Sequence, residues 1–271
     1  MKTTTSTRIN KTLVLFFLLL IALIQTSQAE SLRLVVQPIM TPAKTAQAYQ
    51  PLVEYLRQTT GQDIELVTAR NFFTFWESMK QEDTYDLVLS AAHLTDYLIE
   101  RMDYQPLARL PDRVSFSLVT GKDTLIFSPE ELIGQKVATM GSPSMGAVKL
   151  AELFPNPLRQ PVIIEVPNSQ AAVDRLQTGK AVAAIIPSPL VKQYPDLNTV
   201  KTTELTPHMC ITASSGVPPD IRKSLAEALT KASSTPEGQA MLSTLNLPGF
   251  ESATTKQYQG YARLLEGVWG Y

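Results

Sequence analysis

The chain has 271 residues, of which 24 are Lys or Arg and 25 are Asp or Glu, and its formal net charge is −1. A chain without a basic excess lacks bulk attraction for nucleic acid or for an anionic membrane surface. Its single cysteine, Cys210, excludes an internal disulfide, so stability must come from a hydrophobic core.

The first 29 residues have the pattern of a signal peptide. Lys2, Arg8 and Lys11 precede an apolar run over residues 13–24, and small residues allow cleavage after Ala29. The apolar run is shorter than the roughly 20 residues that cross a bilayer, so a membrane anchor fits less well. Removing this leader takes away three cations and no acids. We therefore expect an exported, mildly acidic mature protein.

Strands and helices alternate through the first part of the mature chain. Thr41-Pro42 marks the start of a long helix, and Gly61 has the place of its left-handed cap. The hydrophobic pattern predicts strands over 32–36, 63–67 and 86–90, and helices over 41–60, 71–80 and 93–101. Such alternation predicts a mostly parallel sheet covered on both faces, with ligands outside the carboxyl ends of its strands.

A second α/β unit follows, entered and left by crossing strands over 114–119 and 209–213. Between the crossings we expect strands over 136–140, 161–166 and 182–186, and a helix over 169–178. Helices over 219–232, 236–245 and 256–267 would pack back on the first unit. The expected fold is a two-lobe clamshell with two hinge crossings, divided into a signal peptide (1–29), lobe 1 (30–117 and 211–271) and lobe 2 (118–210).

A serine-rich turn joins the predicted strand 136–140 to the next helix. A helix start leaves backbone N–H groups without partners and carries a partial positive charge, so it can hold an oxyanion without a lysine. Ser142 and Ser144 would add hydroxyl donors, and Gly141 and Gly146 would let a ligand approach the backbone. The alternative is that Ser142 or Ser144 only caps the helix.

Other segments reach the same predicted cleft. Ser90 and His93 end one strand and open a helix, so His93 is either a ligand donor or an ordinary helix-start histidine. Phe72 is either a cleft wall or part of the core. Ser188, after the strand 182–186, would supply a neutral hydrogen bond. The expected ligand-binding residues are Phe72, Ser90, His93, Thr139, Ser142, Ser144, Met145, Gly146 and Ser188.

Four segments in this order resemble the phosphate, phosphite and phosphonate solute-binding proteins of ABC importers. They are residues 51–61, 85–93, 132–146 and 172–179. The resemblance implies a type II periplasmic-binding fold, a periplasmic location, and a serine turn in which Ser142 and Ser144 hold the phosphonate or phosphate group. Where the family often has a tyrosine, this chain has Phe72 or Phe73, and Ala91-Ala92 replaces a common Gly-Pro. The late strand 183–188 lacks the acid that binds a ligand amine, which disfavours an aminophosphonate.

The expected function is capture of a small oxyanion in the cleft by a monomer that delivers it to a membrane permease, without nucleic acid, cofactor or metal. A periplasmic sensor that presents its closed form to a signalling receptor would use the same closure. An exported serine hydrolase with Ser144 as nucleophile fits less well, because only His93 and His208 could serve as the base. His208 fits a hinge or surface residue better. Two distant histidines also give no usual metal-ligand spacing.

Overall fold

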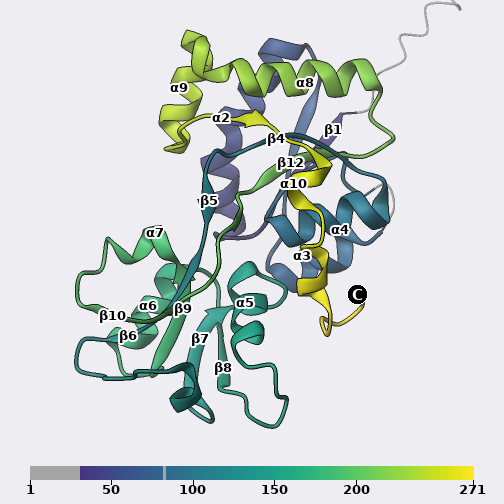
Figure 1. Ribbon diagram of the computed structural model, residues 1–271. Coiled ribbons are helices and arrows are strands. Elements are labelled where there is room, and N and C mark those ends of the chain that lie inside the picture. Colours follow the sequence, from purple (N-terminus) through teal and green to yellow (C-terminus); the bar gives the residue numbers. More distant parts are fainter. Residues whose placement is uncertain (1–30, 82–83) are drawn as a thin grey trace, which may run out of the picture. The chain divides into compact units, whose positions relative to one another are not determined.

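The computed structural model describes residues 31–81 and 84–271, and the signal peptide predicted for residues 1–29 lies outside them. Residues 31–271 form one compact unit. It contains a six-stranded and a five-stranded sheet, joined by a short two-stranded ladder (Figure 1). No helix in the described part of the chain is long and apolar enough to cross a membrane.

In the six-stranded sheet, a strand from the later part of the chain lies between strands from the first part. Its spatial order is β13 (Glu251–Ser252), β4 (Gln105–Arg109), β12 (Cys210–Ala213), β3 (Leu87–Ser90), β1 (Leu32–Val36) and β2 (Ile64–Thr68). β1 pairs in parallel with β2 and β3, whereas β12 is antiparallel to both β3 and β4. The sheet is therefore mixed rather than mostly parallel in its pairing, because the returning chain lies between β3 and β4.

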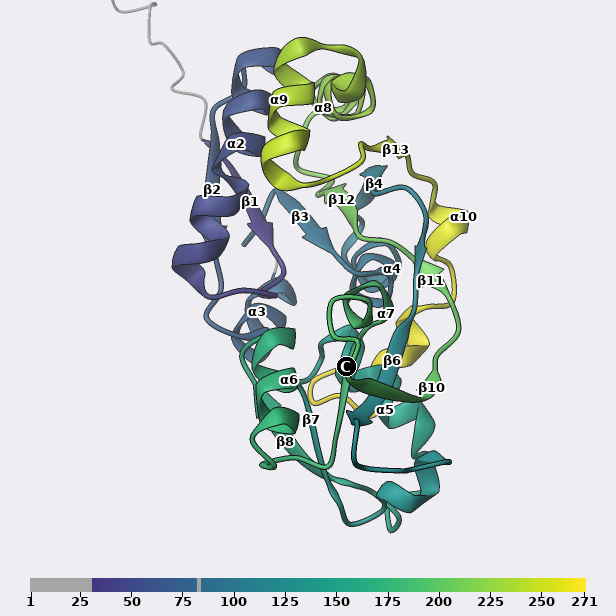
Figure 2. The ribbon, with the colours of Figure 1, turned by 90° about the vertical axis from the view of Figure 1, so that its left-hand side faces the viewer.

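Helices cover both faces of this sheet. They are α2 (Pro42–Thr60), α3 (Phe72–Met79), α4 (Ala92–Met102), α8 (Pro219–Lys231), the 3-10 helix η2 (Ala232–Ser234) and α9 (Pro236–Leu245). Successive strand residues point to opposite faces. In β1, Leu34 and Val36 belong to the core with α2 and α8, whereas Val35 packs with Phe75 and Trp76 of α3. Figure 2 shows α2, α8 and α9 grouped together, and their buried side chains share one core with Leu34 and Val36 on one face of the sheet.

The five-stranded sheet repeats this plan. Its order is β10 (Leu197–Thr202), β6 (Phe116–Gly121), β9 (Ala183–Pro187), β7 (Lys136–Met140) and β8 (Val162–Val166). β7 is parallel to β8 and β9, and β6 is antiparallel to β9 and β10. Its helices are η1 (Pro129–Leu132), α5 (Met145–Leu153), α6 (Ser169–Gln177) and α7 (Ser188–Val191). Here the antiparallel strand, β6, comes directly from the first crossing.

The two crossings pair with each other. β5 (Arg113–Val114) and β11 (Thr206–Pro207) form an antiparallel ladder in which Val114 lies opposite Thr206. Both expected crossings are thus present, and the chain passes from one sheet to the other twice. The division into lobes at 30–117, 118–210 and 211–271 stays a prediction.

The C-terminal segment differs from the expected helix over 256–267. It forms two short helical turns, α10 (Thr255–Tyr258) and the 3-10 helix η3 (Ala262–Leu265). Gly260 separates them with a φ of 85°, a left-handed conformation that ends a helix. η3 packs on α4 and also on α5, so this segment contacts helices of both sheets. In Figure 1 the yellow segment can be followed past α4 toward α3.

Candidate functional site

A cavity of about 740 Å3 lies where strands of both sheets end, and we call it the strand-end cavity. Its lining includes Gln37 after β1, Ala91 after β3, Met140 at the end of β7 and Pro187 at the end of β9. The start of α6, residues 168–171, adds backbone from the five-stranded side. The carboxyl ends of parallel strands are the usual ligand sites of α/β sheets. This cavity is therefore the candidate site.

The second crossing brings His208 into the wall of the strand-end cavity. The ring Nδ1 of His208 accepts a hydrogen bond of 2.8 Å from the backbone N–H of Met209. Burial lowers the pKa of His208, and this outweighs the opposing effect of Asp112. The ring is therefore neutral at pH 7 and carries its proton on Nε2, which makes Nε2–H a donor.

Gln37 fixes the start of α4 beside the cavity. Its Oε1 accepts a hydrogen bond of 3.0 Å from the backbone N–H of Ala91, and its Nε2 donates to the sulfur of Met209 at 3.0 Å. An amide nitrogen has two N–H groups and a thioether is a weak acceptor, so Gln37 keeps donor capacity. The side chain thus joins the ends of β1 and β3 to the second crossing.

The serine turn is closed by its own hydrogen bonds. The Ser144 hydroxyl donates to the Met140 carbonyl at 2.9 Å and accepts from the Ala147 N–H at 3.2 Å, so Ser144 is the N-cap of α5. Ser144 is fully buried. A Cβ on Gly146 would lie 3.2 Å from Thr139 Oγ1, so Gly146 allows α5 to approach β7 closely. These residues hold the helix against its sheet.

Ser142 lies on the outer side of this turn, where it is exposed. It lines a smaller cavity of about 420 Å3 together with Arg70 and Glu165. A Cβ on Gly141 would lie 3.1 Å from a carboxylate oxygen of Glu165, so Gly141 makes room for that side chain. The cavity beside Ser142 thus holds one cation, Arg70, and one carboxylate, Glu165, whose charges oppose each other toward an oxyanion.

His93 links α4 to the serine turn. Its ring Nε2 lies 2.7 Å from the carbonyl oxygen of Pro143, and the ring is fully buried. Burial lowers the pKa of His93 to about 4; the hydrogen bond to Pro143 opposes this shift, and nearby Lys149 adds to it. The neutral ring donates from Nε2, and its Nδ1 finds no partner among the described residues.

Comparison with known proteins shows to which family the chain belongs. The family model for the ABC transporter, phosphonate, periplasmic substrate-binding protein matches residues 34–258. The chain belongs to this family. A search among curated proteins finds no significantly similar sequence.

Solved structures of similar fold include other substrate-binding proteins. PhnD1 from Prochlorococcus marinus, in complex with methylphosphonate, is 12% identical over 88% of this chain and 98% of its own, with a TM-score of 0.75. XAC2383 from Xanthomonas citri, bound to ATP, is 15% identical over 89% and 98% of the two chains, with a TM-score of 0.73. A binding protein component of a phosphonate transporter from Pseudomonas aeruginosa is 12% identical over 86% and 85%, with a TM-score of 0.73. The expected type II periplasmic-binding fold is confirmed.

As a phosphonate-family substrate-binding protein, the chain is a periplasmic solute-binding component of the ABC transporter type. The structure places two of the nine expected binding residues, Phe72 and Met145, in the wall of the strand-end cavity. The hydroxyl of Ser90 bonds to Thr95, and that of Ser188 bonds to two other serines. Contact with a ligand stays a prediction for all nine, and seven of them do not line this cavity. The seven are Ser90, His93, Thr139, Ser142, Ser144, Gly146 and Ser188.

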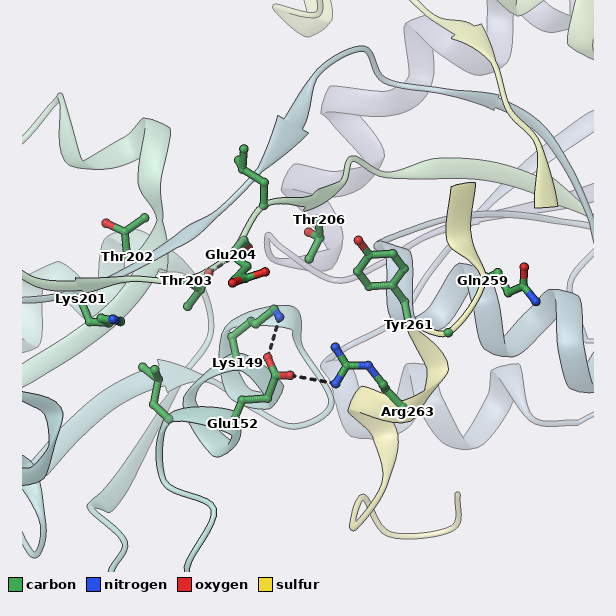
Figure 3. A pocket seen from close by; sticks show the side chains of 13 residues that line it. Lys149, Glu152, Lys201, Thr202, Thr203, Glu204, Thr206, Gln259, Tyr261 and Arg263 are labelled. Carbon is green, nitrogen blue, oxygen red and sulfur yellow. Dashed lines mark hydrogen bonds and ion pairs between the residues drawn. The ribbon is translucent and has the colours of Figure 1, made fainter. Parts of the chain in front are cut away.

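A further cavity of about 630 Å3 lies between α5, the second crossing and η3 of this substrate-binding protein. Figure 3 shows Glu152 between Lys149 and Arg263. The distances from the Glu152 carboxylate are 2.5 Å to the Lys149 ammonium and 3.4 Å to the Arg263 guanidinium. Because Lys149 and Arg263 already share one carboxylate, and Glu204 lines the cavity together with Lys201, this cavity suits an oxyanion less well than its three cations suggest.

Sequence reasoning missed Gln37 and Glu165 and treated His208 as a hinge or surface residue. Gln37 directly follows the strand 32–36, and residues after the carboxyl ends of parallel strands commonly lie near a ligand. Glu165 and His208 gave no local signal, because their places in the cavity walls depend on how distant segments of the chain pack. In the described part of the chain, no group of three His, Cys, Asp or Glu side chains is arranged to hold a metal ion.

Proposed function

We propose that this protein captures a small oxyanion-bearing solute in the strand-end cavity and delivers it to the permease of an ABC importer. The supporting observation is the position of the cavity, which takes its walls from the strand ends of both sheets and from both crossings. A ligand that contacts both sheets favours the conformation in which they approach each other. That conformational change is what a permease can recognise.

Neutral donors would hold the oxyanion. The backbone N–H groups at the start of α6 are the main candidates for binding the oxyanion. The Asn168 side chain accepts only from the N–H of Ala171, at 2.9 Å, so the N–H groups of Ser169 and Gln170 stay available at the helix start. His208 Nε2–H and Gln37 Nε2–H add side-chain donors. Each hydrogen bond to a charged group contributes about 1.5 to 3 kcal/mol, so four donors support micromolar affinity after ordering costs.

The proposal also covers the mature form of the protein and its lack of catalysis. The mature protein would begin after Ala29, remain a monomer, bind no nucleic acid or cofactor, and catalyse no reaction. The hydrogen bonds of Ser144 support the last point, because its hydroxyl is buried and caps α5 while the nearby His93 ring donates to Pro143. A sensor role is not favoured, since the family is one of transporter components.

A matched pair of variants tests the site. Ser169 is half-buried in the cavity wall at the first position of α6. Ser169→Asp adds a negative charge that suits the helix start but repels an oxyanion, and Ser169→Asn adds the same shape without charge. In titration calorimetry with methylphosphonate, phosphite, phosphate and sulfate, Ser169→Asp should weaken the best ligand at least fivefold, as expected for roughly 1 kcal/mol of close repulsion. Equal affinities of the two variants would place the oxyanion elsewhere.

A further inference from the structure

Apolar side chains from both sheets form much of the wall of the strand-end cavity. Six of them, here called the apolar wall, are Ile39, Phe72, Phe116, Met140, Met145 and Leu190. Ile39 follows β1, Met140 ends β7, and the other four lie at the starts of α3, β6 and α5 and in α7. Because they belong to segments of both sheets, a ligand in the cavity meets apolar side chains from both.

Three hydroxyl groups among the expected binding residues are used inside the protein, whereas Ser169 lines the cavity at the start of α6. The hydroxyls of Ser144 and Thr139 donate to the Met140 carbonyl, and that of Ser90 bonds to Thr95 at 3.2 Å. All three side chains are buried, and none lines the strand-end cavity. A fully polar inorganic ion held at the start of α6 would therefore face carbon and sulfur on the side of the apolar wall, at the cost of lost hydration there.

Few charges are available for a charged substituent on the ligand. Among the described residues that line the cavity, Lys44 and Asp174 carry formal charges, and both are exposed at its rim. Asp174 also accepts a hydrogen bond of 2.9 Å from Gln170. The deep part of the cavity thus offers no carboxylate to a ligand ammonium group.

We propose that the natural ligand is an organic oxyanion with an apolar alkyl or aryl substituent that packs against the apolar wall. This inference rests on the proposed function, since it uses the same cavity and the same donors for the oxyanion. It distinguishes the ligand from inorganic phosphate, which has no substituent, and from an aminoalkyl phosphonate, whose ammonium group would lie beside methionine and phenylalanine. Methionine side chains suit such a wall, because they adapt to substituents of different shape.

A series of ligands with one head group tests the proposal. Titration calorimetry would compare inorganic phosphate, methylphosphonate, n-butylphosphonate, phenylphosphonate and 3-aminopropylphosphonate. Each buried methylene contributes roughly a three- to fourfold gain in affinity, so n-butylphosphonate should bind at least tenfold more tightly than methylphosphonate. The 3-aminopropyl compound has nearly the same length as the butyl compound and should bind at least tenfold more weakly than it.

Variants of the wall locate the substituent. Met145→Gln keeps the length of the side chain and makes it polar, so it should lower the affinity for n-butylphosphonate more than the affinity for methylphosphonate and thereby reduce the ratio of the two. Leu190→Gln, at a half-buried position, is a second test if Met145→Gln does not fold. Met102→Gln is the control, because Met102 lies on α4 and does not line the cavity. The thermal midpoint of each empty variant checks that it is folded.

The outcomes separate the two proposals. A preference for n-butylphosphonate or phenylphosphonate that Met145→Gln or Leu190→Gln weakens supports the apolar substituent. Equal or tighter binding of phosphate, methylphosphonate or the aminopropyl compound overturns this inference and leaves the proposed function in place. A folded protein that binds none of these compounds overturns both.

Discussion

His93 and Pro143 are joined by a hydrogen bond of 2.7 Å between the ring Nε2 and a backbone carbonyl. The bond connects α4, beside the six-stranded sheet, to the turn before α5, beside the five-stranded sheet. Both partners are buried, so water does not compete for this contact. The serine turn is therefore stabilised by two contacts: the capping hydrogen bonds of Ser144, and the hydrogen bond from His93 of α4.

Acidification should weaken the fold through His93. The pKa of this ring is about 4 in the folded protein and near its ordinary value of 6.5 in the unfolded chain. Between these values the unfolded chain binds more protons, so the contribution of His93 to the free energy of unfolding is full above pH 6.5 and decreases as the pH falls toward 4. Urea unfolding at pH 7.5, 6 and 5 measures this loss.

The matched variant for that measurement is His93→Gln, whose amide can donate to the same carbonyl without titrating. Asp96, on the same helix, has a pKa raised by burial, so its contribution to the free energy of unfolding increases as the pH falls. The effect of His93 is therefore the difference between the natural protein and the His93→Gln variant at each pH. The variant should lose less stability than the natural protein between pH 7.5 and 5. Parallel curves would contradict the role of His93.

Ser144 and Ser142 should respond differently to alanine. Ser144→Ala removes the cap of α5 and should lower the free energy of unfolding by about 1 kcal/mol, within the usual range of about 0.5 to 2. Ser142→Ala, at an exposed position, should change it by no more than about 0.5 kcal/mol. Thermal and urea unfolding of the two empty variants decide the point, and equal losses would argue against a capping role specific to Ser144.

Gln37 should matter for stability as well as for the site. Gln37→Leu leaves the Ala91 N–H without its acceptor, and an unsatisfied buried donor costs about 1 to 3 kcal/mol. Gln37→Glu keeps an acceptor at the start of α4, where a negative charge is favourable, and should cost less. Urea unfolding at pH 7.5 compares them. A larger loss for the glutamate variant would mean that burial of its charge dominates.

Gly146 and Thr139 should be energetically coupled. A methyl group at position 146 would meet Thr139 Oγ1 at 3.2 Å, which is tighter than ordinary contact. Removal of that oxygen in Thr139→Ala creates space, so Gly146→Ala should be more favourable in the Thr139→Ala background than in the natural one. A double-mutant cycle from urea unfolding measures the coupling, expected at about 0.5 kcal/mol or more. Additive effects would show that the turn relaxes elsewhere.

Much of the fold could be predicted because local patterns and tertiary packing agree. Thr41-Pro42 and Gly61 mark the ends of α2 as expected, and the strand expected over 136–140 has the bounds of β7. The expected helix over 256–267 was wrong in its middle, where Gly260 takes a left-handed conformation. Helical spacing of apolar residues alone does not reveal such an interruption.

The site was harder to predict because hydroxyl groups can bond in several directions. Ser144 could hold an anion or cap α5, and its sequence neighbours are the same in both cases. The hydrogen bond from the Ala147 N–H to the Ser144 hydroxyl establishes the cap. Phe72 and Met145 are the first residues of the helices that follow β2 and β7, and both line the cavity. His208 reaches it through the pairing of β5 with β11, two strands about ninety residues apart in sequence.

The place of β12 between β3 and β4 also constrains how the protein can be made. Residues 210–213 pair with β3 on one side and with β4 on the other. The two strands therefore cannot be joined into one sheet until synthesis and export have passed residue 213. A nascent chain that stops earlier leaves two open strand edges, which are templates for aggregation. Late arrival of this one strand thus favours holding the whole polypeptide unfolded until it has crossed the membrane.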